Sequence, residues 1–144
     1  MSFRLPTAVL LVAFAAVAML AAMHPPRANQ SGEIGTWRIL HQLERKALRD
    51  YEHHISNSDV LQRGQILMNL ARSDRFAPTG QSCRWAAAAL SYMVSGYYFS
   101  AQRLEVAFDW HHYRGHYLER RSECLQDLGL DATTYPLPYW FVHR

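Results

Sequence analysis

The chain has 144 residues, of which 49% are hydrophobic and 19% are charged, enough for one domain with a substantial core. Its 15 basic and 12 acidic residues leave a net charge of +3, too small an excess to indicate a nucleic-acid-binding protein. Lys46 is the only lysine, a skew that we attribute to a GC-rich bacterial genome.

The N-terminal segment, residues 1–23, is predicted to send the chain across a membrane. Arg4 precedes an uncharged apolar run from Leu5 to Met23. A signal peptide needs such a start and centre, and small residues before the cut, which the alanines between positions 16 and 22 provide. A membrane anchor needs about 20 apolar residues, and the run is just long enough. The many alanines favour cleavage and a periplasmic domain; an uncleaved segment would anchor that domain in the inner membrane.

Two helices are predicted to follow a linker at residues 24–35. Apolar residues recur at helical spacing in the first, which is expected over residues 33–55. Ser56–Asp59 then offer cap residues for the second helix, which has one apolar face beginning at Val60. The segment Ala77–Gly80 contains a proline and a glycine and should end it.

The third predicted helix contains a run without any charged residue, residues 85–102, and apolar side chains surround the helix there. Such a helix either is central in a bundle or spans a membrane. The run is near the lower length limit for a span and contains serines and tyrosines, so we expect a central helix. A fourth helix is predicted over residues 101–128, ending at Gly129. The expected fold is therefore all-α, a compact bundle of about four helices within residues 36–132.

Cys83 and Cys124 are predicted to form a disulfide that staples a helical hairpin. They lie at the start of the third helix and near the end of the fourth, and the midpoint between them falls near Arg103, where we expect the turn. Folding that hairpin brings the two sulfurs together in a compartment that permits disulfides. The spacing is not Cys-x-x-Cys, so a structural role is favoured over a redox role.

The fourth predicted helix also carries acidic and histidine residues that are spaced three or four apart and therefore share one face. Helical bundles build metal sites from carboxylates and histidines at such spacing. The alternative is a solvated face, which we favour because apolar side chains occupy the other sides of the helix. The six residues are Glu105, Asp109, His112, His116, Glu119 and Glu123, of which Asp109, His112, His116 and Glu119 are the metal-ligand candidates.

The C-terminal segment, residues 133–144, is unusually apolar for a chain end. Its two prolines are expected to exclude a helix and to keep the segment extended. Tyr139, Trp140 and Phe141 are candidate partner-binding residues, because aromatic side chains dominate the energy of protein interfaces. The alternative is that the segment folds back onto the bundle, which we favour because exposed aromatic clusters promote aggregation.

The sequence contains no Gly-x-Ser-x-Gly turn, no phosphate-binding glycine loop and no haem attachment motif. We therefore expect a binding role in place of catalysis, and no cofactor. The function that we expect is an exported protein-binding module, such as a periplasmic immunity protein or an accessory subunit of a bacterial envelope complex. Its partner would be another envelope protein, with membrane contact only through an uncleaved N-terminal segment. A metal-binding protein or metal-dependent enzyme is the alternative.

Overall fold

The computed structural model describes residues 30–76, 80–102 and 108–143. The predicted signal or anchor segment and residues 24–29 of the predicted linker lie outside these ranges, whereas residues 30–35, also predicted as linker, are helical. In the described ranges the structure is helical and contains no strand, as the sequence predicts. The helices are α2 (Gln30–Glu52), α3 (Ser58–Arg72), α4 (Gln81–Ala101), α5 (Trp110–Asp127) and α6 (Tyr139–His143), with short 3-10 helices η1 (Asp74–Phe76) and η2 (Ala132–Thr134).

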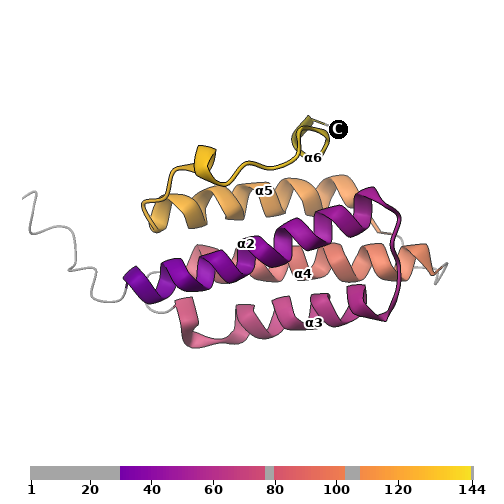
Figure 1. Ribbon diagram of the computed structural model, residues 1–144, viewed down its shortest axis with the longest axis horizontal. Helices are drawn as coiled ribbons and strands as arrows, with labels where there is room; N and C mark the ends of the chain where they lie inside the picture. The colour runs from indigo at the N-terminus through magenta and orange to yellow at the C-terminus, as the bar shows by residue number, and fades with distance from the viewer. Residues whose placement is uncertain (1–29, 77–79, 103–107, 144) are drawn as a thin grey trace, which may run out of the picture.

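Helix α4 lies between α3 and α5 and packs along both, while α2 crosses one face of α4 (Figure 1). The core lies between these four helices, and its largest buried side chains include Trp37, Leu67, Leu90 and Leu125. None of the helices in the described ranges is long and apolar enough to cross a membrane. Helix α4, which contains the charge-free run, packs against the other three long helices and is the central helix of the bundle, as predicted.

Two glycines bring neighbouring segments close to α4. At Gly64 on α3, a Cβ atom would lie 2.7 Å from the Ser95 hydroxyl of α4, and Ser91 donates to the Gly64 carbonyl over 2.7 Å. At Gly96 a Cβ atom would overlap the ring of Phe108, which lies just before α5. Small residues at these points allow α3 and the start of α5 to approach α4 closely.

The predicted disulfide is confirmed: Cys83 of α4 is bonded to Cys124 of α5, with their Cα atoms 4.5 Å apart. The bond joins the first turn of α4 to the last turns of α5, so these antiparallel helices form the stapled hairpin that the sequence indicates. The expected turn near Arg103 lies outside the described residues. The other prediction for this hairpin, that α5 begins near residue 101, is wrong.

Helix α5 begins at Trp110 because Asp109 caps it. The Asp109 carboxylate accepts from the backbone N–H of His112 over 3.0 Å, which satisfies a donor that the first helical turn leaves free. Gln102 likewise terminates α4, so the two helices are separate elements. Asp109 therefore lies at the end of the helix and not along the predicted acidic and histidine face, and Glu105 lies outside the described residues.

The expectation of a wholly extended C-terminal segment is also wrong. Residues 132–134 form η2, and α6 begins immediately after Pro138, whose carbonyl accepts from the N–H groups of Phe141 and Val142. A proline is compatible with this position because the first turn of a helix needs no hydrogen bond from its own N–H groups. The segment runs back along α5 with α6 at its end (Figure 1).

Candidate functional site

A buried network of polar side chains joins α2 to α5. Glu44 of α2 is fully buried, and one of its carboxylate oxygens accepts from Arg121 Nε over 2.6 Å and from the Tyr117 hydroxyl. The other oxygen accepts from His41 Nδ1 over 2.6 Å and from a second Arg121 nitrogen over 3.3 Å. Each carboxylate oxygen of Glu44 thus accepts from two donors, as a buried charge requires.

The donors determine the ionisation of the network. Burial alone would raise the pKa of Glu44, but the hydrogen bonds from His41 and Arg121, the positive charge of Arg121 and the Tyr117 hydroxyl together lower it. Burial and the neighbouring Glu44 charge raise the pKa of Tyr117 well above its ordinary value. At neutral pH the network therefore holds an ionised Glu44, a neutral Tyr117 and a charged Arg121.

The same network positions the C-terminal segment. A terminal nitrogen of Arg121 donates to the Tyr135 carbonyl over 2.6 Å, and the guanidinium lies 5.5 Å from the centre of the Trp37 ring. The Tyr135 ring meets Trp37 edge-on, with ring centres 5.6 Å apart, and His41 in the same manner at 5.1 Å. The chain after η2 is thereby fixed against α2 and α5.

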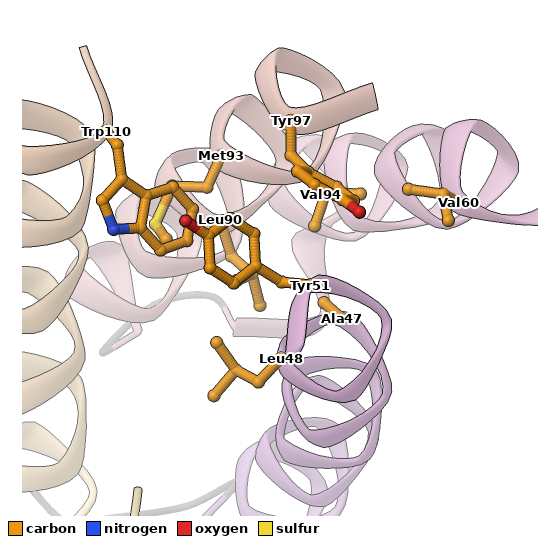
Figure 2. Close-up of a pocket in the computed structure, with 9 residues that line it drawn as sticks. All are labelled: Ala47, Leu48, Tyr51, Val60, Leu90, Met93, Val94, Tyr97 and Trp110. Carbon is orange, nitrogen blue, oxygen red and sulfur yellow. The ribbon is translucent and has the colours of Figure 1, made fainter. Parts of the chain in front are cut away.

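An aromatic stack fixes the end of the same segment. Tyr51 of α2 stacks with two rings, Trp110 at a centroid distance of 4.1 Å and Trp140 at 5.6 Å. Figure 2 shows Tyr51 beside Trp110, with Leu90 and Met93 close by. These residues line a cavity with a volume of about 20 Å³. That volume holds about one water molecule, so this cavity is a packing void and not a ligand site.

A larger groove lies between α2 and the C-terminal segment, above the buried carboxylate. Its volume is about 510 Å³. The α2 side presents the exposed Arg45 and Arg49, with Glu52 at one end, and the opposite side is apolar. The lining residues are His41, Glu44, Arg45, Leu48, Arg49, Glu52, Thr134, Pro136, Leu137 and Pro138. Because Arg121 already neutralises Glu44, the groove has a basic wall facing an apolar wall.

The predicted metal-ligand residues are only partly brought together. His112 and His116 are exposed on α5, and His116 Nδ1 lies 3.8 Å from Glu119 Oε2. Asp109 is occupied as the cap of the helix. Among the residues that the structure describes, no three His, Cys, Asp or Glu side chains are grouped closely enough to hold a metal ion.

The three aromatic residues predicted to bind a partner have different surroundings. Phe141 is fully buried and contacts Trp110 and Tyr117, and Trp140 is half-buried on Tyr51. Tyr139 is 78% exposed. The segment therefore packs on the bundle, as favoured from the sequence, and leaves mainly Tyr139 for contact with another molecule.

Sequence reasoning missed the Glu44 network and the groove. The sequence does contain one indication of the network, because Glu44 lies between Leu40 and Ala47 on the apolar side of the first predicted helix. A carboxylate at such a position needs a buried cation or several donors. Its partners on α5 are 73 and 77 residues away in the chain, so only the packing of the helices reveals them.

Comparison with known proteins assigns no family to the chain: no family model matches it, and neither does any curated protein or solved structure.

Proposed function

We propose that the protein is an exported protein-binding module that takes a segment of another envelope protein into the groove between α2 and residues 134–138. A groove with a basic wall and an apolar wall is complementary to a segment that carries both acidic and apolar side chains. One observation supports this proposal most: the exposed Arg45 and Arg49 line the same groove as the apolar residues 136–138. Arginine is enriched at protein interfaces because its planar group makes two hydrogen bonds to a carboxylate.

Two further features support a binding role in the envelope. The Cys83–Cys124 disulfide is compatible with an oxidising, exported location. The Glu44 network lies beneath the groove, and Arg121 holds the C-terminal segment that forms its far wall. Because both walls are fixed in this way, binding should cost little conformational entropy. An immunity protein against a periplasmic toxin and an accessory subunit of an envelope complex both fit this description.

Affinity capture with charge-reversed variants tests the proposal. Tagged protein is used to capture partners from native envelope extracts, and the captured proteins are identified by mass spectrometry. Arg45→Glu with Arg49→Glu should reduce capture of the specific partner at least tenfold, because the basic wall becomes acidic. The matched control is Arg38→Glu with Lys46→Glu, which makes the same charge change at exposed positions of α2 outside the groove.

The two variants separate a groove partner from general electrostatic attraction. Equal loss of capture in both would show that net charge, and not the groove, drives binding. Retention in both would exclude the basic wall as the binding surface. Captured segments that lack acidic residues would contradict the proposed complementarity. Metal analysis of the same purified samples tests the alternative of a metal-binding protein.

A further inference from the structure

The face of α4 that points away from α2 is only partly covered within the described part of the chain: Ser95 lies against Gly64 of α3, and the Tyr92 ring contacts Tyr113 of α5. On the α2 side, Leu90, Met93 and Tyr97 cluster with Ala47, Leu48 and Tyr51 (Figure 2). The opposite face carries side chains at alternating intervals of three and four residues, so they form one straight stripe along the helix. The members of this α4 stripe are Trp85, Ala88, Tyr92, Ser95 and Phe99.

Large and small side chains alternate along the α4 stripe. The aromatic residues Trp85, Tyr92 and Phe99 recur every seven residues, and the small residues Ala88 and Ser95 lie between them. Trp85 is 52% exposed and Tyr92 is 56% exposed, although both belong to the most apolar helix of the bundle. Exposed aromatic residues that follow a heptad period indicate a helix-packing surface.

The same face is hollowed beside Ser95. A groove of about 430 Å³ opens there, with Met68 of α3 on one side and Tyr113 of α5 on the other. Its lining includes the small residues Gly64, Ser91 and Gly96, at which α3 and Phe108 approach α4 closely. The face therefore has a protruding aromatic side chain, Trp85, and a hollow at Ser95 that lies about 15 Å further along the helix at 1.5 Å per residue.

We propose that this face binds a second copy of the chain, with the two α4 helices packed antiparallel about a two-fold axis that crosses the α4 stripe between Ala88 and Tyr92. In that register Trp85 of each copy enters the Ser95 hollow of the other, and each Ala88 lies opposite Tyr92. Each of these two kinds of layer then pairs a large residue with a small one, and Phe99 lies beyond them. A parallel pairing in register would oppose large with large, so the alternation favours the antiparallel arrangement.

Charge and symmetry support a second copy as the occupant. From Trp85 to Gln102 the chain has no charged residue, so two identical faces meet without opposing like charges, although each copy carries a net charge of +3. A two-fold interface must be complementary to itself, which requires a protrusion and a matching hollow on one surface. The α4 stripe provides both, and it lies on a different face from the groove next to α2.

Sedimentation velocity of the disulfide-bonded protein, measured over a wide concentration range, tests the dimer. Trp85→Ala removes the inserted side chain and should raise the dimer dissociation constant by roughly 30-fold or more, the effect of losing an aromatic hot spot. Ala88→Phe adds apolar surface but places a large residue opposite Tyr92 of the copy, so it should also produce monomers. The matched control is Ile66→Ala, which truncates another exposed apolar side chain outside the α4 stripe and should leave the dimer intact.

Ala88→Phe distinguishes specific packing from non-specific hydrophobic association, because non-specific association would increase when apolar surface is added. Stronger association of this variant, or a dimer that Trp85→Ala leaves intact, would overturn the proposal. A wild-type protein that stays monomeric at every concentration would also overturn it. A monomer that captures a different protein through Trp85 would assign the face to a heterologous partner. Circular dichroism of each variant confirms that the helices are retained.

Discussion

Glu44 has no exposure to solvent and is nevertheless held ionised, because His41, Tyr117 and Arg121 all direct donors at its carboxylate. Such a group contributes specificity of packing: α2 and α5 must meet in one register for all the donors to reach it. Arg121 extends the same requirement to the C-terminal segment through the Tyr135 carbonyl. Glu44 and Arg121 together thus link α2, α5 and the C-terminal segment.

Glu44→Gln should destabilise the protein by about 3–5 kcal/mol at neutral pH, the usual cost of removing one partner from a buried ion pair. The substitution keeps the size of the side chain but leaves the Arg121 charge without its counter-ion. Urea unfolding of both proteins measures the difference in the free energy of unfolding. The exposed Glu52→Gln is the control and should change stability by less than about 0.5 kcal/mol.

The lowered pKa of Glu44 also predicts the pH dependence of stability. A carboxyl group whose pKa is lower in the folded state stabilises the protein above the unfolded value of about 4.3, and this contribution is lost as the pH falls through the folded value. Wild type should therefore lose stability on acidification more steeply than Glu44→Gln, and the difference between them should narrow. A difference that stays constant on acidification would show that folding does not lower the pKa of Glu44.

His112 and His116 are exposed on α5, so replacing both with glutamine should leave folding and partner capture unchanged. Exposed substitutions away from caps and buried networks change stability by less than about 0.5 kcal/mol. The thermal midpoint and the metal content of the purified protein are the measurements. Near-stoichiometric zinc, iron or manganese that disappears on the double substitution would support the metal-binding alternative instead.

At the scale of elements, the disulfide closes the end of the α4–α5 hairpin where Cys83 and Cys124 meet. Replacing both cysteines with serine should lower stability by about 4 kcal/mol, since the bond closes a loop with a sequence separation of 41 residues. The thermal midpoint should fall by roughly 10–20 °C. The helical circular dichroism signal at low temperature should stay the same, because the packing of α4 does not depend on the bond alone.

Non-reducing peptide mapping supplies the companion measurement. A single peptide pair joined through Cys83 and Cys124 is expected from the native protein. Two free thiols would contradict both the bond and the register of the hairpin.

The sequence predicts the elements better than their ends. Periodic apolar residues locate the four long helices, and the two cysteines predict which of them pair. Periodicity predicts too early a start for α5 because residues 101–109 contain few helix-breaking residues, whereas the structure uses Asp109 as a cap. The short helix α6 was missed because a proline ahead of a helix resembles a proline that prevents one. Hydrogen bonds at helix ends, and not side-chain periodicity, decide both boundaries.

The candidate site was beyond the reach of sequence periodicity for a different reason. The groove exists only because residues 134–138 return to α2, and that return depends on Arg121, Tyr51 and Trp140 meeting partners from distant helices. A periodic pattern reports which face of a helix is buried. It does not report which other segment covers that face, so the groove could not be derived before the packing was known.

At the scale of the whole molecule, the C-terminal segment is part of the folded unit. Phe141 is fully buried against Trp110 and Tyr117, and its carbonyl accepts from Arg114 over 3.1 Å. The same segment forms one wall of the proposed binding groove, so both the stability of the bundle and the proposed binding depend on it. Removing it should affect both, whereas a segment that only docks on a partner would affect binding alone.

Deleting residues 135–144 should therefore lower the free energy of unfolding by about 5 kcal/mol or more, because loss of one buried Phe side chain alone costs roughly 3–5 kcal/mol. The deletion also leaves Arg121 and Arg114 without the carbonyls of Tyr135 and Phe141. Phe141→Ala should show most of this loss, while Tyr139→Ala, which changes the 78% exposed neighbour, should show little. Thermal and urea unfolding compare the three variants. A truncated protein with unchanged stability but no partner capture would contradict this prediction, since it would show that the aromatic residues serve the partner and not the bundle.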